Sequence, residues 1–469
     1  MLFNSLEFLA FLIIFLGLWP LLRGQRNRRW IGIVAASFFF YGWWDWRFCF
    51  LLIGSGLVDF FAAGAMQRYP HRKKFFLLVS IAANLGTLAT FKYLDFAIDN
   101  LNALLPSLGI DSQLAPMRLM LPIGISFYTF QSMSYTIDVY RGQIAPTRNV
   151  LHFFAYLAMF PQLVAGPVVR ASSMLDQLDA PVCPTERDRW EGFHLMVRGF
   201  FKKMVIADGL APLVAAAFDN TTVVPSAAYW WIIMAMFAFQ IYGDFSGYSD
   251  IARGIARWMG YDFPMNFNHP YLATSFRDFW SRWHISLSTW FRDYVYVPLG
   301  GSQRGAWRSH ANLWATMLIS GLWHGAAWTF VGWGAVHAAC LSIERIAQWP
   351  RRLLKLHGGR HVAALIVFAT VLLSWVFFRA TSFAQAGSVL AMMFGTHGLN
   401  TAAVHQLLHW RDLMPLAIML LYHGWLHFDP PLPRLRWAGP VLQPAALAML
   451  IWCCVYLRGP GNAFIYFQF

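Results

Sequence analysis

The sequence Ser320-Gly-Leu-Trp-His-Gly325 lies within an apolar stretch that runs from residue 312 to residue 348. This stretch predicts two apolar helices, with His324 set deep inside the first of them. Gly321 and Gly325 form a small-xxx-small pair, which lets another backbone approach closely inside a bilayer. An ionisable residue at membrane depth is costly, roughly 3 kcal/mol on insertion scales for a full charge, so a functional site is the default hypothesis. The alternative is a neutral histidine that is hydrogen-bonded to a neighbouring helix.

Three tryptophans accompany this histidine, as if the hairpin lined a shaped cavity and not merely a lipid face: Trp323, Trp328 and Trp333. Counted from Asn312, His324 lies about twelve residues into the helix, or roughly 18 Å at 1.5 Å per residue. That depth is past the middle of a ~30 Å hydrocarbon core, so we expect substrates to reach it only through channels. The sequence therefore predicts His324 as the working residue.

The composition is that of a membrane protein. Of 469 residues, 58% are hydrophobic and 12% are charged, whereas soluble domains carry about 25% charged residues. We expect an all-α polytopic fold with about eleven transmembrane helices plus re-entrant or interfacial helices, in one integral-membrane domain over residues 1–469. The net charge of +14 lies in short clusters between apolar runs, as the positive-inside tendency requires. Nucleic-acid binding is therefore not expected.

The alternation of apolar runs and basic clusters predicts the topology. A first span over residues 8–22 is followed by four arginines, which places the N-terminus outside, and the last span exits so that the C-terminus is also outside. Residues 95–117 are expected to form a polar outer loop. Residues 151–169 are apolar enough to span, but a basic stretch follows them. We therefore expect a re-entrant or interfacial segment, broken at Pro161 and at Gly166-Pro167.

Residues 274–297 form a second informative stretch. Ser275 followed by Asp278 resembles a capping box, which would begin a helix that Pro298 ends. Such a charged helix cannot easily cross a bilayer, but it can lie at the cytoplasmic interface or dip into the protein.

Within that helix, Trp280, His284 and Leu287 would share one face. Three arginines add positive charge: Arg277, Arg282 and Arg292. Two interpretations remain open. The arginines could contact lipid phosphates on a membrane-surface helix, or they could attract a phosphate-bearing donor to a cytoplasmic mouth, with His284 facing inward.

The segment from Tyr242 to Asp250 is unusually polar for a sequence that follows an apolar run. Asp244 and Asp250 could serve a proton relay or orient a histidine. Alternatively, they cap helix ends or pair with Arg253 and Arg257.

The five cysteines predict neither a disulfide framework nor a metal site. None forms a CxxC pair, and four lie in or beside apolar runs, where they are typical of small hydrophobic residues.

Several motifs together resemble one known family. Arg277-Asp-Phe-Trp-Ser-Arg-Trp-His284, followed about forty residues later by Leu322-Trp-His-Gly325, resembles the signature of the membrane-bound O-acyltransferase family. Further matches are Pro161-Gln-Leu-Val-Ala-Gly-Pro167, Gln240-Ile-Tyr-Gly-Asp-Phe-Ser-Gly-Tyr-Ser-Asp250 and Phe464-Ile-Tyr-Phe-Gln-Phe469. The set is similar to the bacterial polysaccharide branch, which includes alginate O-acetyltransferases and related peptidoglycan and cellulose acetylation proteins.

The resemblance implies a helical fold around a central tunnel in the bacterial inner membrane. An acyl donor, acetyl-CoA by analogy, would enter from the cytoplasm, and the acetyl group would pass to a periplasmic SGNH-type transferase that modifies the polymer. The resemblance implies His324 as the invariant histidine and His284 as the second motif histidine. The other candidate residues are Arg277, Arg282, Trp280 and Trp323 for the donor, and Asp244 and Tyr242 for a polar relay.

A neutral imidazole at His324 could act as general base on the acceptor hydroxyl, a contribution of typically 10²–10⁴ in rate. An acetyl-histidine intermediate is an alternative. Two other classes of function compete with acyl transfer. A glycosyltransferase with a lipid-phosphate donor would need an acidic base near an outer loop, where Asp95, Asp99 and Asp111 are scattered. A transporter or scaffold of a secretion complex would need neither histidine.

Overall fold

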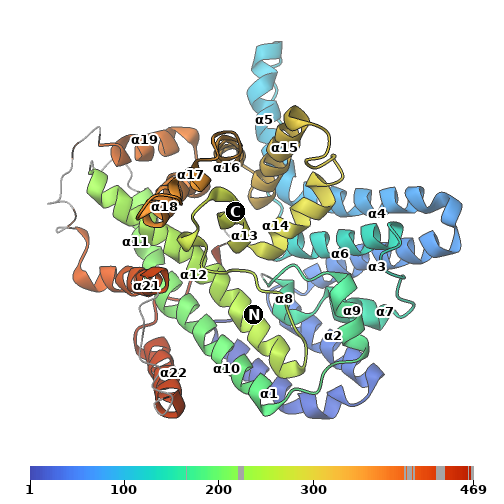
Figure 1. Ribbon diagram of the computed structural model, residues 1–469. Helices are drawn as coiled ribbons and strands as arrows, with labels where there is room; N and C mark the ends of the chain where they lie inside the picture. The colour runs from blue at the N-terminus through green and yellow to red at the C-terminus, as the bar shows by residue number, and fades with distance from the viewer. Residues whose placement is uncertain are drawn as a thin grey trace. The chain divides into compact units, whose positions relative to one another are not determined.

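The computed structural model describes residues 1–164, 166–219, 226–395, 398, 404, 407–428, 439–462 and 464–465. Every regular element within these residues is helical, which confirms the predicted all-α fold (Figure 1). The chain divides into two compact units: residues 1–193 with 252–264, and residues 194–251 with 265–469. The single domain over residues 1–469 stays a prediction. Ala165 and residues 466–469, which belong to two of the predicted motifs and to the C-terminus, lie outside the described residues.

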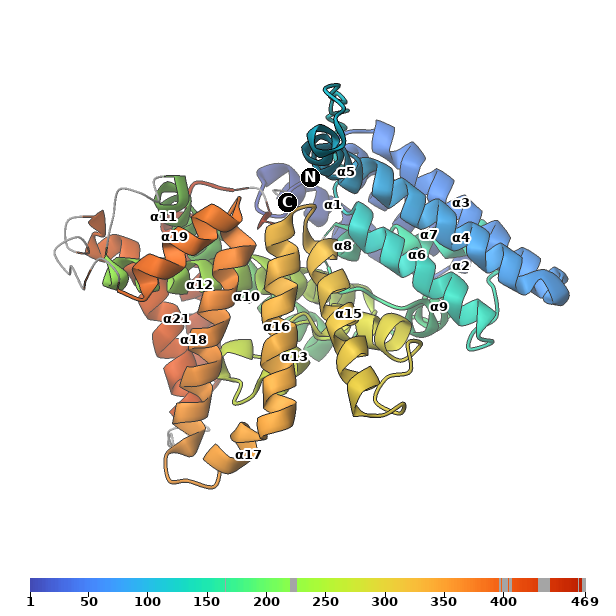
Figure 2. The same ribbon diagram turned by 90° about the horizontal axis from the view of Figure 1, so that it is seen from above.

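The first unit is built from helices that precede Phe193. They are α1 (Leu6–Arg23), α2 (Arg26–Gly42), α3 (Arg47–Arg68), α4 (Lys73–Leu88), α5 (Leu94–Leu104), α6 (Ile125–Tyr140), α7 (Val150–Leu157), α8 (Phe160–Leu163), α9 (Ala171–Asp179) and the start of α10 (Glu186–Phe201). Within this unit α3, α4 and α6 pack side by side (Figure 2). Their contact buries polar side chains as well as apolar ones.

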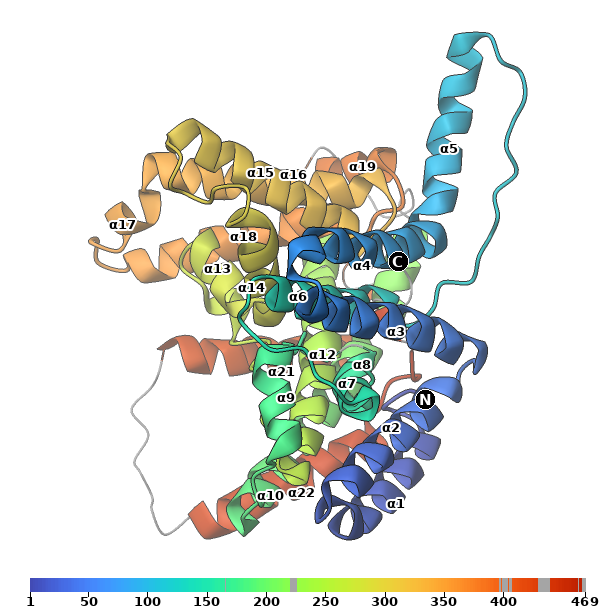
Figure 3. The same cartoon turned by 90° about the vertical axis from the view of Figure 1, so that its right-hand side faces the viewer.

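Helix α4 continues into α5 through a π-helical turn at Ala89–Tyr93, and Figure 3 shows α5 extending beyond α4. The prediction of an outer loop over residues 95–117 is therefore wrong in its first half. Leu94, Ile98 and Leu101 recur at helical spacing, and this periodicity extends the helix although the segment also carries Asp95 and Asp99.

The apolar segment over residues 151–169 is broken. Helices α7 and α8 have eight and four residues, and each is far too short to cross a ~30 Å core. The break lies at Ala158 and Met159, and Pro161 occupies the first turn of α8 instead of ending a helix. Proline is tolerated there because backbone N–H groups in the first turn of a helix have no intrahelical acceptor, so the absent N–H costs no hydrogen bond.

The second unit contains α11 (Asp208–Asp219), α12 (Ala227–Met259), α13 (Phe276–Arg282), α14 (Ile285–Phe291), α15 (Ala306–His324), α16 (Trp328–Ala347), α17 (Trp349–Leu353), α18 (Gly359–Arg379), α19 (Phe383–Met393), α21 (Trp410–Phe428) and α22 (Gly439–Tyr456). Helices α10 and α12 contribute residues to both units. Two π-helical segments follow α10 and α14, at Lys202–Ala207 and at Arg292–Tyr296.

Four helical stretches within the described residues are long and apolar enough to cross a membrane. They are Leu6–Arg23, Arg47–Arg68, Pro70–Leu108 and Gly359–Arg379. Together with the family match below, they show a polytopic membrane protein. The number of about eleven crossings and their directions stay predictions.

The crossing of α15 and α16 depends on glycine. A Cβ atom at Gly321 would meet the carbonyl oxygen of Phe330, and one at Gly334 would meet the carbonyl oxygen of Met317. The predicted partner of Gly321, Gly325, lies at the C-terminal cap of α15 with extended backbone instead of in the crossing. The close approach therefore joins Gly321 to Gly334 of the next helix, because the chain reverses at Gly325.

We expect Gly321→Ala to lower the stability of the folded protein by about 1–3 kcal/mol, since the added methyl group must push two backbones apart. The measurement is thermal unfolding in detergent. Gly387→Ala in α19 is the control, because a Cβ there meets no atom within 4 Å. The interpretation fails if both variants unfold at the wild-type temperature.

Candidate functional site

His324 is the last residue of α15 and is buried. This differs from the expected position deep inside a helix, because Gly325 adopts an extended conformation (φ −160°, ψ 151°) and the chain turns toward α16. The carbonyl groups in the last turn of a helix have no intrahelical partners, and they carry the negative end of the helix dipole. The imidazole therefore lies where a developing positive charge is stabilised, typically by 0.3–1 kcal/mol.

Aromatic side chains from three helices surround His324. Its ring centroid lies 5.0 Å from that of Trp323, 5.0 Å from that of Trp333 and 5.3 Å from that of Phe378. The three partners belong to α15, α16 and α18. This aromatic wall excludes water, and electrostatic interactions are stronger in such surroundings.

His284 lies in a break between two short helices. The predicted continuous helix over residues 274–297 is wrong, because His284 has φ +42° and separates α13 from α14. The predicted cap is confirmed: the Ser275 hydroxyl accepts a hydrogen bond from the Asp278 N–H (2.9 Å). Left-handed backbone is uncommon for a residue with a Cβ atom, and it persists only where the surroundings hold it.

Asn266 holds this turn in place. Its carbonyl oxygen accepts from the Ile285 N–H (2.9 Å), and its side-chain Oδ1 accepts from both the N–H (3.2 Å) and the hydroxyl (2.9 Å) of Ser286. Asn266 Nδ2 in turn donates to the Ser249 hydroxyl (3.2 Å). The two residues that follow His284 are thereby fixed to a buried amide.

The structure brings the two predicted histidines into contact with one indole. The Trp323 ring lies 6.2 Å from the His284 ring and 5.0 Å from the His324 ring, centroid to centroid. The Phe245 ring also packs on His284, at 4.4 Å. The spacing of forty residues in sequence therefore corresponds to proximity in space.

The predicted relay residues of α12 face other groups. Asp244 pairs with Lys203 (2.9 Å) and accepts from the Ile465 N–H (2.7 Å), while the Tyr242 ring lies 5.7 Å from that of His423. Asp250 pairs with Lys202 (2.7 Å). Asp250 and Asp244 thus each pair with a lysine, Lys202 and Lys203 respectively.

Sequence reasoning missed the role of these two lysines, which it counted only among the basic residues of a cytoplasmic stretch. Lys203 is buried and also binds Asp208 (2.8 Å) and the Asn462 carbonyl oxygen (3.0 Å). The sequence does contain an indication of these ion pairs, because two adjacent lysines inside an apolar run require buried carboxylates as partners. Their π-helical segment is the kind of irregularity that often marks functional sites.

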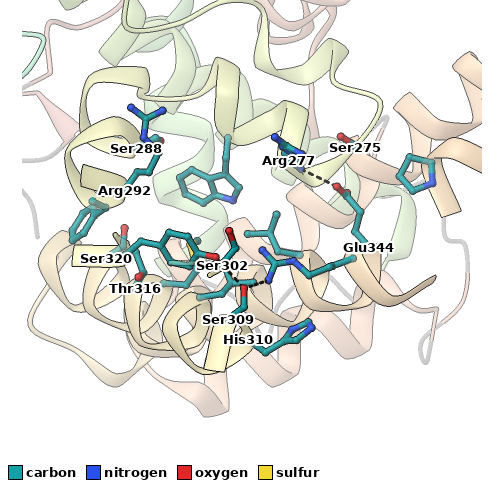
Figure 4. A pocket seen from close by; sticks show the side chains of 18 of the residues that line it. Ser275, Arg277, Ser288, Arg292, Ser302, Ser309, His310, Thr316, Ser320 and Glu344 are labelled. Carbon is teal, nitrogen blue, oxygen red and sulfur yellow. Dashed lines mark hydrogen bonds between the residues drawn. The ribbon is translucent and has the colours of Figure 1, made fainter. Parts of the chain in front are cut away.

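A cavity of about 910 Å³ lies among α13–α17 and the π-helical segment at Arg292–Tyr296 (Figure 4). Ser309, Thr316 and Ser320 line it from one face of α15. His324 continues this face one turn beyond Ser320, because residues four apart are neighbours on a helix. The cavity therefore follows the helix face that leads to the buried histidine.

Positive charge surrounds the cavity. Its lining includes four arginines, Arg277, Arg292, Arg345 and Arg351, and one carboxylate, Glu344. Glu344 accepts hydrogen bonds from the backbone N–H groups of Phe276 (2.5 Å) and Arg277 (3.3 Å) at the start of α13. Arginine is well suited to bind phosphate, so the lining fits an anionic, phosphate-bearing ligand.

The four predicted donor-binding residues separate into two groups. Arg277 and Trp280 line the cavity. Arg282 does not belong to the lining and pairs with Asp278 (2.7 Å), and Trp323 contacts both histidines. His337, which the sequence did not single out, packs on Trp333 at 4.8 Å, and its Nε2 lies 3.1 Å from the Ser374 hydroxyl.

Comparison with known proteins gives consistent matches. The model of the membrane-bound O-acyltransferase family matches residues 140–385. A probable alginate O-acetylase of Pseudomonas putida is 41% identical over 84% of this chain and 80% of its own length. A peptidoglycan O-acetyltransferase of Helicobacter pylori is 35% identical over 85% and 81%. A teichoic acid D-alanyltransferase of Streptococcus thermophilus is 27% identical over 55% and 68%.

We expect Asn266→Ala to lower the turnover of the protein, because the turn that presents His284 loses its side-chain hydrogen bonds, each worth about 1 kcal/mol. The measurement is acetyl transfer by purified protein at saturating donor, together with thermal unfolding. Asn102→Ala is the matched control, because that amide also holds a backbone segment, through two hydrogen bonds with Leu114 (2.9 and 2.8 Å). Equal turnover of the two variants would contradict the role of the turn.

Proposed function

Since the chain belongs to the membrane-bound O-acyltransferase family and is an O-acyltransferase, we propose that it moves acetyl groups across the bacterial inner membrane for O-acetylation of an extracytoplasmic polysaccharide. The donor is acetyl-CoA from the cytoplasm, and the polysaccharide is alginate, with peptidoglycan and cellulose as the other candidates. The names of the relatives from Pseudomonas putida and Helicobacter pylori support this substrate class. The acetyl group leaves through a periplasmic SGNH-type transferase.

One observation carries this proposal: the arginine-lined cavity follows the α15 face that leads to His324. Coenzyme A carries several negative charges, and a site with four arginines compensates them. The acetyl thioester would extend from this charged end along Thr316 and Ser320 toward the histidine. The charged carrier thus stays at the arginines, while only the small neutral acetyl group moves on.

In the proposed reaction, His324 takes the proton of an acceptor hydroxyl as its oxygen attacks the thioester carbonyl carbon. A C–O bond forms and the C–S bond breaks, after which the imidazolium returns its proton to the thiolate. General base catalysis of this kind contributes typically 10²–10⁴ in rate. The carbonyl end of α15 stabilises the transient imidazolium, and the aromatic wall of Trp323, Trp333 and Phe378 keeps water from the thioester.

His284, which also contacts Trp323, supports this chemistry. The turn that carries it is held by Asn266, and its imidazole packs on Phe245. We assign it the positioning of the donor, because Trp280 before it and Leu287 and Ser288 after it line the cavity. An acetyl-histidine intermediate is not needed for this pathway.

The two competing functions have less support. A glycosyltransferase needs a free acidic base near the outside, yet the Asp95 carboxylate already accepts from the N–H groups of Met117 (2.7 Å) and Arg118 (2.9 Å). A transporter or scaffold needs no aromatic enclosure around two histidines.

We expect His324→Ala to reduce acetyl transfer by about 10²–10⁴ while expression and folding stay near normal, because the variant loses its proton acceptor but not its fold. The measurements are the O-acetyl content of the secreted polymer and transfer of labelled acetyl from acetyl-CoA. His409→Ala, at an exposed histidine, is the control. An unaltered acetate content in His324→Ala would refute the assignment and would favour a scaffold.

We expect Arg277→Ala to raise the KM for acetyl-CoA about ten- to a hundredfold with a smaller effect on kcat, because a hydrogen bond to a charged group is worth roughly 1.5–3 kcal/mol. Arg282→Ala is the matched control, since its guanidinium pairs with Asp278 instead of lining the cavity. Steady-state kinetics over a donor series measures both. The placement of the donor is wrong if Arg282→Ala shows the larger rise in KM.

A further inference from the structure

A buried carboxylate in the first unit has no role in the proposed acyl transfer. Asp59 of α3 has no exposed surface, and its hydrogen-bond partners belong to α4 and α6. Its Oδ1 accepts from the Ser80 hydroxyl (2.5 Å) and from Asn84 Nδ2 (2.9 Å). Its Oδ2 accepts from Asn84 Nδ2 (2.8 Å) and from the Ser132 hydroxyl.

All of these partners are electrically neutral. Within the described residues, no lysine, arginine or histidine forms an ion pair with Asp59. Neutral donors solvate a carboxylate but leave its net charge in place, and an uncompensated charge inside an apolar bundle is strongly unfavourable. This carboxylate therefore needs a positive charge that the neighbouring side chains do not supply.

The cluster contains more oxygen atoms than its hydrogen bonds use. The Thr136 hydroxyl accepts from Ser80 (2.9 Å) and adds a third hydroxyl group to the cluster. Ser55 is more than nine-tenths buried, and it lies one turn before Asp59 on the same face of α3. Among the residues that the structure describes, neither its Oγ nor the buried Asn84 Oδ1 has a hydrogen-bond partner.

We propose that the Asp59 cluster, formed by Ser55, Asp59, Ser80, Asn84, Ser132 and Thr136, binds a sodium ion. Oxygen-only ligands select hard cations. Hydroxyl hydrogens rotate freely, so the same serines and threonine can turn their lone pairs toward an ion.

The charge of the cluster selects the ion. The single carboxylate of Asp59 matches a monovalent cation, whereas a divalent ion would leave the buried site positive. The Ser80 hydroxyl lies 2.5 Å from Asp59 Oδ1 and 2.9 Å from the Thr136 hydroxyl, so these oxygens must move apart to admit an ion, and Na⁺ requires a smaller displacement than the larger K⁺. The bound ion would join three helices through one centre, and binding would therefore stabilise the folded state.

The test is thermal unfolding of the purified full chain in detergent, in NaCl, KCl and N-methylglucamine chloride at equal ionic strength. The unfolding midpoint of the wild type is expected to rise and saturate with Na⁺ but not with N-methylglucamine, and equilibrium binding of ²²Na⁺ is expected to show a saturable site. Ser132→Ala should weaken the apparent Na⁺ affinity about tenfold or more. Ser134→Ala is the control, because the Ser134 hydroxyl donates to the Gln131 carbonyl oxygen, and this variant should leave the affinity unchanged.

Asp59→Asn removes the charge and should abolish both the Na⁺ response and the ²²Na⁺ binding. The proposal is overturned if the wild-type midpoint is the same in Na⁺ and N-methylglucamine with no saturable ²²Na⁺ binding, the result expected for a protonated Asp59. It is also overturned if Asp59→Asn keeps the Na⁺ response. If Asp59→Asn does not fold, the ion series on the wild type and the Na⁺ affinity of Ser132→Ala still test whether the cluster binds Na⁺. None of these measurements uses acetyl transfer, so the outcome is independent of the proposed function.

Discussion

The close crossing of α15 and α16 is the constraint on which the candidate site depends. Gly321 and Gly334 remove the side chains that would hold the two backbones apart, so α16 can bring Trp333 against His324. Dispersion attraction between the helices falls steeply with even a small gap. The same approach places the α15 face with Thr316 and Ser320 beside α16 and thereby gives the cavity two of its walls.

Burial of polar groups organises the rest of the second unit. Lys203 binds Asp208 and Asp244, and Asp244 in turn holds the N–H of Ile465. Breaking one such partner would leave an uncompensated charge, which is far more costly than the small net worth of the intact pair. The neighbour of Ile465, Phe464, packs on Phe245 at 5.5 Å, and Phe245 packs on His284. The C-terminal segment is thus connected to the motif histidine through one phenylalanine.

The sequence predicted those features that depend on local patterning. The all-helical fold, the cap at Ser275 and the end of the helical segment before Pro298 follow from periodicity and from backbone chemistry, and all three are confirmed. The break at His284 could not be predicted in this way. It requires Asn266, some twenty residues earlier, to hold the strained turn, and no local pattern records that partner.

The partners of buried polar groups could not be predicted from the sequence for the same reason. Helical periodicity indicates whether Asp244 faces the protein interior or its surface. It does not indicate whether the partner of that carboxylate is a histidine, an arginine or Lys203. Lys203 lies within the π-helical segment at Lys202–Ala207, where the backbone departs from regular helical periodicity, so that periodicity does not predict its direction. Asp59 shows the limit of this reasoning, because its hydrogen bonds come from two helices, α4 and α6, and still leave its charge unbalanced. Where every protein donor is neutral, the missing positive charge must come from outside the chain, either from an ion or from a proton.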